Sequence, residues 1–524
     1  MSAAVAVEAA GRLRERRLSR PALLLVAVFA VAALVSGFTI LRGIDPFDEG
    51  LALQAARRVG DGQMPYRDFL WGYGPGGPYT LAALRGLFGD SLLDWRILRV
   101  LIDAGIATTA FALVRRETAS RALAAVAALV AACALADPRT ANPFAYALLL
   151  ALLAFHVATG GPGLVTVRRA AAAGALLGAT AAFRVDFAVY GLAAVAVALV
   201  LRGRWRAIAP LTAGTGLVAL LLYAPFLIAI GPGDLYDALI GTSLRESAYW
   251  TLPFPTEYHD SIGGLGDLKN ALAYYQPLVA VAGLALAALA FALRWRADRR
   301  APWLGAALVV LGGGFAVYLR SRTDEFHVQP LDVTLAVLIP LAIVASRRTR
   351  PLAVALAAVL ALVALHTVGQ RAEALVDPPT MVAVRVPVAD GVKAPPDQAR
   401  ALEQTVATVD ALVPPGEPIY VLPRRSDLVR IGAPVLYVLT QRDNPTPRDH
   451  GLLTGAAAQR SIVATLERVR PKAIVRWTDP ASSVAEPNLR GRPSGVTLLD
   501  DWVAQHYALR SRAGYYDVLV PNGG

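Results

Sequence analysis

The sequence predicts an α-helical polytopic membrane protein with about eleven transmembrane helices and a C-terminal soluble α/β domain. Hydrophobic residues make up 56% of the 524 residues and charged residues only 17%, whereas soluble domains carry about a quarter charged residues. Long apolar runs alternate with short arginine-rich clusters, as in a bundle of membrane helices. Beyond residue 370 the chain becomes richer in proline and charge, which indicates a separate domain.

The basic character of the chain has a topological explanation. A net charge of +12 is also typical of proteins that bind nucleic acid. The arginines, however, lie mostly in short loops between apolar runs, where positive charge marks the cytoplasmic side. We therefore predict no nucleic-acid partner. The single cysteine, Cys133, excludes an intrachain disulfide, so the soluble domain must fold on its own core.

The first apolar run covers residues 21–41 and sets the orientation of the chain. Five arginines precede it: Arg12, Arg14, Arg16, Arg17 and Arg20. They place the N-terminus in the cytoplasm. A cleaved signal peptide is the alternative interpretation. The run is long enough to cross a bilayer, which takes about 20 residues, and we predict an uncleaved anchor.

Further apolar runs continue the pattern along the membrane part of the chain, residues 1–369. They cover residues 96–114, 122–136, 143–160, 168–184, 187–201, 207–230, 277–293, 302–319, 328–345 and 351–368. With this count nearly every arginine cluster between spans falls in the cytoplasm. The first loop (43–95), a long loop (231–276) and the tail then lie on the outer face. Arg184, Arg320 and Arg322 are exceptions with acids beside them.

The tail, residues 370–524, is predicted to be a small α/β domain. The runs PIYVLP, APVLYVLT, KAIVRW and YYDVLVP are typical of strands, and helical patterns cover 402–413, 458–469 and 498–506. The chain has no G-x-x-x-x-G-K-[ST] loop and no G-x-G-x-x-G after a strand. Because both motifs are absent, neither gives support for an ATP-driven pump or a nucleotide-sugar enzyme.

The first outer loop carries the densest set of chemically useful side chains. It begins with the acids Asp45, Asp48 and Glu49, and residues 48–60 fit an amphipathic helix with acids at its N-terminus. Arginines and aromatic residues follow, interleaved with glycine and proline. A belt of interfacial aromatics with solvated charges is the simpler interpretation. Such belts rarely combine paired acids with a Gly-Pro-rich turn.

This loop resembles that of the GT-C glycosyltransferases, which include protein O-mannosyltransferases and the aminoarabinose transferases that modify lipid A. The shared features are one span after a basic tail, an Asp-Glu pair, a PYRDF segment and a YGPG segment. RTDEFHVQP, with Arg322, Asp324 and His327, is a weaker match. The resemblance covers the layout of the membrane part. It implies transfer of a sugar from a polyprenyl-phosphate carrier to an acceptor hydroxyl outside the cytoplasm.

The resemblance implies that the catalytic residues lie in the first loop. Asp48 aligns with the family acid and is the expected general base, and one carboxylate suffices for a single inverting displacement. Glu49 is expected to orient Asp48 or to contact the acceptor. Asp45 is the competing candidate for the base.

The leaving group would be a lipid phosphate, which arginine binds with paired N–H donors. The candidate ligands are Arg58, Arg67, Arg184, Arg320, Arg322 and His327. Two simpler interpretations stay open. For Arg184 and Asp186 the simpler interpretation is a plain ion pair. For residues 320–327 it is that they only anchor two helices in the interface.

Four residues are candidates for the acceptor side of the site: Asp137, Tyr249, Glu257 and His259. Asp137 would bind acceptor or help to hold a divalent cation, or it is a plain turn residue. The first loop has no D-x-D motif, so the metal ligands stay unknown. His156, His366 and Asp103 lie within spans and are left out of the site, the two histidines as packing residues.

Alternative functions are a transporter or flippase of lipid-linked glycans, an oligosaccharide ligase, or a scaffold. A transporter should show related halves, broken helices or acids buried within spans, whereas here the polar residues gather in outer loops. An enzyme is favoured. Its partners would be the polyprenyl-phosphate sugar, membrane lipids, and a glycan, lipid or protein acceptor. The alanine- and arginine-rich composition indicates a bacterial inner membrane protein, with its C-terminal domain outside the cytoplasm.

Overall fold

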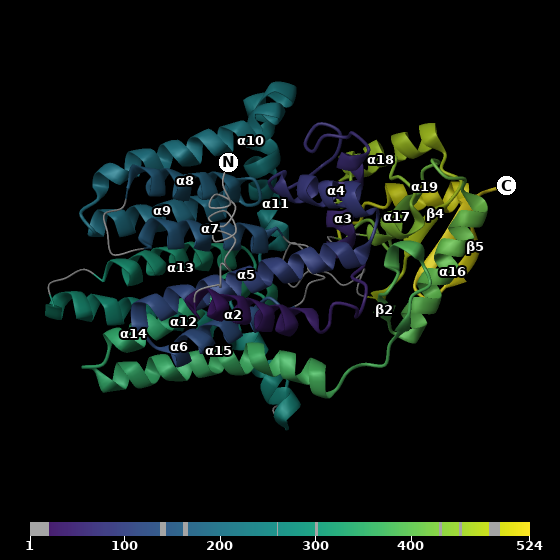
Figure 1. Cartoon of the computed structure of the whole chain (residues 1–524). Helices are drawn as coiled ribbons and strands as arrows, with labels where there is room; N and C mark the ends of the chain where they lie inside the picture. Colours follow the sequence, from purple (N-terminus) through teal and green to yellow (C-terminus); the bar gives the residue numbers. More distant parts are fainter. Residues whose placement is uncertain are drawn as a thin grey trace, which may run out of the picture.

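The computed structural model confirms the polytopic helical fold (Figure 1). It describes residues 20–136, 143–160, 166–258, 260–261, 263–298, 302–428, 432–449, 453–480 and 493–523. Every predicted span corresponds to a helix. These helices are α2 (Arg20–Gly37), α5 (Leu92–Thr118), α6 (Arg121–Ala134), α7 (Phe144–Thr159), α8 (Val167–Ala181), α9 (Val185–Leu201), α10 (Ile208–Tyr236), α12 (Leu265–Asp298), α13 (Trp303–Ser321), α14 (Glu325–Ala345) and α15 (Arg350–Val376). Among the described residues, six helices are long and apolar enough to cross a bilayer, and four more are apolar but shorter.

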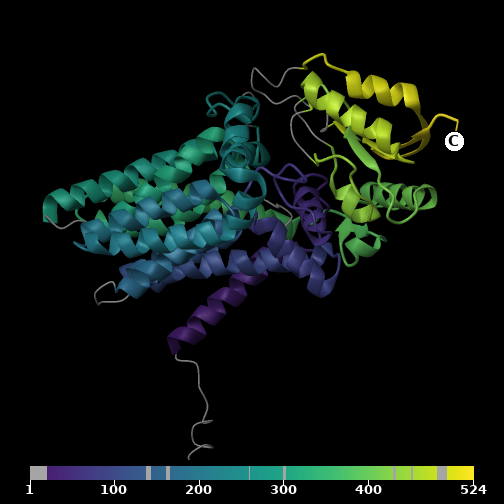
Figure 2. The ribbon, with the colours of Figure 1, turned by 90° about the horizontal axis from the view of Figure 1, so that it is seen from above.

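The bundle packs around α14, which is buried along most of its length. Small residues let neighbouring helices approach closely, as is typical of membrane bundles. A Cβ on Gly174 of α8 would lie 2.0 Å from the Leu211 carbonyl oxygen of α10, so only glycine fits there. Figure 2 shows α2 diverging from the other helices at the edge of the bundle.

The segment predicted as a long outer loop, 231–276, is mostly helical. α10 continues to Tyr236 past a kink at Gly231, and a π-helix (Asp237–Gly241) and α11 (Thr242–Trp250) follow. α12 begins at Leu265 and contains Pro277, which the sequence suggested as a helix start. Proline is tolerated inside membrane helices because neighbouring groups satisfy the freed backbone.

The first loop forms α3 (Asp48–Gly60), as predicted, and α4 (Gly76–Phe88). Both helices lie between the bundle and the C-terminal domain (Figure 1). α3 packs against α17 (Val435–Thr440) of that domain. A Cβ on Gly50 would lie 2.1 Å from the backbone nitrogen of Val435, so the two backbones are in direct contact.

The C-terminal domain has one four-stranded sheet in the order β3-β4-β6-β5, with β3 and β4 parallel and the other pairs antiparallel. Its elements are β1 (Val382–Ala383), a 3-10 turn (Pro387–Ala389), β2 (Lys393–Ala394), α16 (Pro396–Leu412), β3 (Tyr420–Pro423), α17 (Val435–Thr440), α18 (Ala456–Val469), β4 (Ile474–Trp477), α19 (Leu498–His506), β5 (Tyr507–Ala513) and β6 (Tyr516–Pro521). The run APVLYVLT was predicted as a strand and is helix α17. A short, fully buried apolar run does not distinguish the two structures by its pattern.

The C-terminal domain has one buried apolar cluster made only of its own residues, between Tyr420 and Leu519, and shares a second cluster with the first loop. Ile44 and Leu92, from the two ends of the first loop, belong to this second cluster. The backbone also crosses the boundary. Gly43 N donates to Lys393 O at 2.7 Å, and Lys393 N donates to Leu41 O at 2.7 Å. The first loop and the tail are therefore one packed unit.

Candidate active site

The candidate site lies where the first loop meets the turns between α8 and α9 and between α13 and α14. We call its residues the polar cluster: Asp48, Tyr73, Arg184, Asp186, Tyr318, Asp324 and His327. They come from four separate stretches of sequence, and the contacts described below hold these stretches together.

Asp48 is the first residue of α3, and its position is fixed by Asp45. Asp45 Oδ1 accepts the backbone N–H groups of Phe47 (2.8 Å) and Asp48 (2.6 Å). These are donors that the start of a helix otherwise leaves without partners. Asp45 thus acts as the cap of α3. Asp48 is half-buried at the positive end of the helix dipole, which favours its ionised form.

Glu49 lies fully buried in an ion pair with Arg96 of α5. Arg96 Nε and Nη2 donate to its two carboxylate oxygens at 2.6 and 2.8 Å. Arg96 also donates to the carbonyl oxygens of Ile40 and Gly43, each at 2.8 Å. Burial raises the pKa of the Glu49 carboxyl, and Arg96 opposes that effect. This geometry gives Glu49 the role of holding α3 on α5.

The YGPG segment joins the first loop to the turn after α8. Gly74 N donates to Phe183 O at 3.2 Å, and Gly76 N donates to Ala182 O at 2.7 Å. A Cβ on Gly74 would lie 2.1 Å from the Ala182 carbonyl oxygen, so this approach requires glycine. The pairing places the Tyr73 ring 5.6 Å from the Arg184 guanidinium carbon.

Arg184 stands at the centre of the polar cluster. Its Nε and Nη2 donate to Asp186 at 2.9 and 2.6 Å. Its guanidinium also lies over the rings of Phe187 (5.2 Å) and Tyr318 (4.8 Å). Within the described residues Nη1 makes no hydrogen bond, and the Tyr318 hydroxyl is buried without a hydrogen-bond partner. The cluster therefore contains polar groups that a ligand would satisfy.

The turn between α13 and α14 adds an Asp–His pair. Asp324 caps α14, because its Oδ1 accepts the backbone N–H of His327 at 2.8 Å and lies 2.6 Å from His327 Nδ1. Arg322 Nε donates to Asp324 Oδ2 at 2.7 Å. Burial alone would raise the pKa of Asp324, but His327 and Arg322 outweigh it and lower this pKa. With Nδ1–H on Asp324, His327 presents Nε2 as its second polar atom, beside Tyr318.

Electrostatics connects Asp48 with the rest of the cluster. Burial raises the pKa of Tyr73, and the Arg184 guanidinium lowers it. The carboxylates of Asp48 and Asp186 both act to raise it. Asp48 and Arg184 thus act on the same hydroxyl. Of the residues predicted from the sequence, the fold brings together Asp48, Arg184 and the Arg322–His327 turn.

Arg58 has a different environment, in a clamp between α3 and the C-terminal domain. Its Nε and Nη2 donate to Asp449 at 2.6 and 3.0 Å, and Nη2 also donates to Thr446 O at 2.7 Å. Its Nη1 donates to Gln63 at 2.9 Å. These contacts assign Arg58 to docking of the C-terminal domain.

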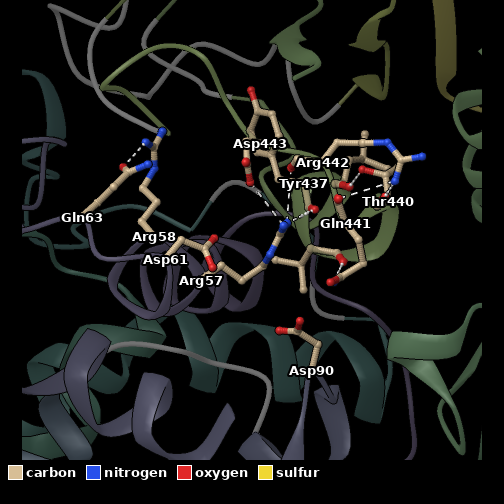
Figure 3. Close-up of polar contacts among 12 residues, drawn as sticks. Arg57, Arg58, Asp61, Gln63, Asp90, Tyr437, Thr440, Gln441, Arg442 and Asp443 are labelled. Carbon is tan, nitrogen blue, oxygen red and sulfur yellow. Dashed lines mark hydrogen bonds and ion pairs between the residues drawn. The ribbon is translucent and has the colours of Figure 1, made fainter. Parts of the chain in front are cut away.

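The neighbouring Arg57 completes this clamp (Figure 3). It donates to the Tyr437 carbonyl oxygen, to Arg442 O at 3.3 Å and to Asp443 at 3.3 Å. Arg57 and Arg58 are both buried. Two buried cations on α3 therefore have their partners in the segment 437–449 of the tail.

The remaining candidates occupy more peripheral positions. Arg67 is half-exposed and binds its neighbour Asp68, while Arg320 and Glu257 are exposed. Tyr249 is half-buried at the end of α11, whose following segment reaches the turn before α14, since Thr323 Oγ1 donates to Leu252 O at 2.9 Å. Two further candidates, Asp137 and His259, lie outside the described residues.

The structure also shows polar residues that the sequence analysis did not use. Tyr318 and Arg96 were missed. For Arg96 the sequence did carry a signal, because a lone charge in an apolar helix normally has a buried partner. Asp103 of α5 accepts from Arg99 Nε (3.0 Å) and Ser36 Oγ (2.9 Å). Asp332 of α14 accepts from Gln276 at 2.8 Å. Acids are thus buried within spans, contrary to the expectation that polar residues gather in the loops.

In the part of the chain that is described, no three His, Cys, Asp or Glu side chains are grouped to hold a metal ion.

The chain was compared with known protein families, curated proteins and solved structures. No protein-family model and no curated protein matches the chain. Two crystal structures of ArnT from Cupriavidus metallidurans do match, one in the apo state and one bound to undecaprenyl phosphate, with TM-scores of 0.55 and 0.53. Each match has 15% sequence identity and covers 95% of this chain and 97% of ArnT.

This chain has the GT-C fold. The match extends over both the membrane bundle and the C-terminal domain, because almost the whole of each chain is covered. The fold class implied by the first loop and by the helix layout is therefore confirmed. The polar cluster lies in the first loop of a GT-C bundle and in the turns that this loop contacts.

Proposed function

We propose that this protein is a membrane glycosyltransferase that moves a sugar from a polyprenyl-phosphate carrier to an acceptor hydroxyl. The observation that carries the proposal is the polar cluster, in which the Asp48 carboxylate and the Arg184 guanidinium both act on the half-buried Tyr73, and Nη1 of Arg184 makes no hydrogen bond among the described residues. A base and a phosphate-binding cation are the two groups that this reaction requires. The ArnT structure bound to undecaprenyl phosphate supports the class of donor.

In the proposed reaction Asp48 takes the proton from the acceptor hydroxyl as its oxygen attacks the anomeric carbon. The bond from that carbon to the phosphate oxygen breaks, and the lipid phosphate leaves with the bonding electrons. Attack from the opposite face inverts the anomeric configuration. Asp45 and Glu49 do not exchange protons in this scheme, because one caps α3 and the other is paired with Arg96.

Arg184 stabilises the leaving phosphate in this proposal. Asp186 holds its Nε and Nη2, which directs the remaining N–H donors of Nη1. The Tyr318 hydroxyl supplies a further donor beside it, and His327 Nε2 supplies another in the imidazolium form, since Nδ1–H is already engaged by Asp324. Preorganised donors of this kind stabilise charge that develops in the transition state. Arg322 supports the site by holding Asp324.

The polar cluster is proposed to face the outside of a bacterial inner membrane, with the N-terminus in the cytoplasm. The arginine clusters at the opposite ends of the helices support this orientation. Tyr249 and the segment after it lie near the α13–α14 turn and are proposed to contact the acceptor, a glycan, lipid or protein.

Transport of a lipid-linked glycan is the second candidate, and buried intramembrane acids favour it. Asp103 and Asp332 lie inside the bundle, and such residues often mark a transport path. Both have partners, Arg99 and Ser36 for the first and Gln276 for the second. A structural role therefore accounts for them without transport.

The proposed function is tested by sugar transfer with the full-length protein in nanodiscs. A panel of polyprenyl-phosphate sugars would be offered together with a cell-envelope extract as acceptor. We expect transfer from at least one lipid donor and none from the matching nucleotide sugars. Movement of intact donor across liposome membranes without any transfer would instead establish the transporter.

Arg184→Lys is expected to weaken donor use in this assay. Lysine keeps the charge but loses the planar fork that binds Asp186 and a phosphate together. We expect kcat/KM for the donor to fall by about 10- to 100-fold, with the KM for the acceptor unchanged. Arg320→Lys, at an exposed arginine in the last turn of α13, is the matched control and should behave as wild type. Equal effects of the two substitutions would remove Arg184 from the donor site.

A further inference from the structure

A second polar site lies at the end of the bundle remote from the C-terminal domain. There α5 and α7 end and α8 begins, and a cavity of about 320 Å³ opens between them. Its lining residues are Arg116, His156, Val157, Gly160 and Arg169. Two guanidinium groups and an imidazole from three different helices thus surround one cavity, and the proposed sugar transfer does not use it.

Two nitrogen atoms beside this cavity have no hydrogen-bond partner in the described structure. Arg116 Nη1 and His156 Nδ1 are both buried and unpaired. The other nitrogens of Arg116 are engaged, with Nε donating to Glu117 at 2.8 Å and Nη2 to Thr159 Oγ1 at 2.9 Å. A buried donor without a partner is unfavourable, and an oxyanion in the cavity would satisfy it.

The surrounding charge favours an anion over a cation. Arg169 donates to the carbonyl oxygen of Gly160, and Arg202, at the end of α9, donates to Thr159 O at 3.5 Å. The acid next to these arginines, among the described residues, is Glu117, and it pairs with Arg116. A larger cavity of about 670 Å³ at the same end is lined by two carboxylates, Glu117 and Asp298, and one guanidinium, Arg294, so it lacks this excess of positive charge.

We propose that the cavity lined by Arg116, His156 and Arg169 binds the phosphate group of an anionic phospholipid in the cytoplasmic leaflet. The site lies at the ends of the apolar helices α5 and α7, and the ends of membrane-spanning helices are where lipid head groups are met. Arginine presents paired donors to phosphate, and the neutral or protonated imidazole supplies another hydrogen bond. Basic pockets between membrane helices on this side are suited to such head groups. The lipid would join α5, α7 and α8 at this end of the bundle.

The test measures retention of lipid by the full-length protein in native mass spectrometry. Phosphatidylglycerol, phosphatidylcholine and inorganic phosphate would be offered separately to wild type, to Arg116→Gln/Arg169→Gln and to Arg168→Gln. Arg168 is the exposed neighbour of Arg169 and does not line the cavity, so it controls for general surface charge. We expect phosphatidylglycerol affinity to fall on the order of tenfold in the double variant and to stay unchanged in Arg168→Gln.

The outcomes distinguish the two sources of phosphate. Preferential retention of phosphatidylglycerol, lost in the double variant and not displaced by millimolar inorganic phosphate, supports the lipid site. Displacement by inorganic phosphate would assign the cavity to a soluble anion and overturn the lipid proposal. An equal loss in Arg168→Gln would show only diffuse attraction. His156→Gln provides a milder variant should the double variant fail to fold, and we expect it to weaken retention by a smaller factor.

Discussion

Asp48→Asn is expected to abolish sugar transfer without loss of folded protein. The amide is nearly the same size as the carboxylate but cannot take the proton from an acceptor hydroxyl, so the rate should fall by about 10²- to 10⁴-fold. Asn is also favourable at the start of a helix. The measurement is the initial transfer rate with the best donor of the panel, together with thermal unfolding in detergent.

Asp45→Asn is the matched control for this substitution. Its amide oxygen can still accept the N–H groups of Phe47 and Asp48, so the cap of α3 and the transfer rate should both be largely retained. If Asp45→Asn abolishes transfer and Asp48→Asn does not, the base is Asp45. If both variants remain active, the base lies elsewhere, with Asp137 as the next candidate.

Glu49→Ala is expected to destabilise the protein severely. It leaves the guanidinium of Arg96 buried, with a 0% exposed side chain and no opposing charge. Removing one member of a buried ion pair costs about 3–5 kcal/mol. The change should appear as a large drop in the unfolding temperature in detergent. It should also increase protease sensitivity of the first loop, because Arg96 holds Ile40 and Gly43 as well.

Two controls distinguish the buried charge from a general effect of losing a carboxylate. Glu417→Ala removes an exposed pair with Lys472, at 2.8 Å, and should change the stability by less than about 1 kcal/mol. The double variant Glu49→Met/Arg96→Met removes both charges and fills the space, so it should recover part of the lost stability. An unchanged unfolding temperature in Glu49→Ala would contradict the role assigned to this pair.

The sequence predicted the membrane bundle well because apolar runs and arginine clusters are local properties of the chain. The predictions that were wrong involve segments whose state depends on contacts. The run APVLYVLT is helical as α17, and Gly50 brings α3 against it. Residues 265–276 extend α12, where Gln276 binds Asp332 across the bundle. Such partners are far away in the sequence, so hydropathy alone does not reveal them.

The roles of the basic residues also depended on the fold. Arg58 was predicted to bind the donor phosphate, but it and its neighbour Arg57 are buried against residues 437–449 of the tail. Truncation of the tail would therefore leave two cations unpaired, as well as exposing Ile44 and Leu92. Arg184, in contrast, retains an N–H group directed by Asp186 and surrounded by aromatic rings.

The sequence by itself determined that the chain is a helical membrane protein with an acidic helix start, 48–60, in its first loop. Only the tertiary structure decided how Asp45, Asp48 and Glu49 differ. Asp45 caps α3, Asp48 acts on Tyr73 in the polar cluster, and Glu49 is paired with Arg96. The physical reason is that Asp45 precedes the helix and faces its free N–H groups, whereas Asp48 and Glu49 are successive helical residues, which point about 100° apart. Neighbouring acids of similar chemistry therefore meet different partners, and those partners come from distant parts of the chain.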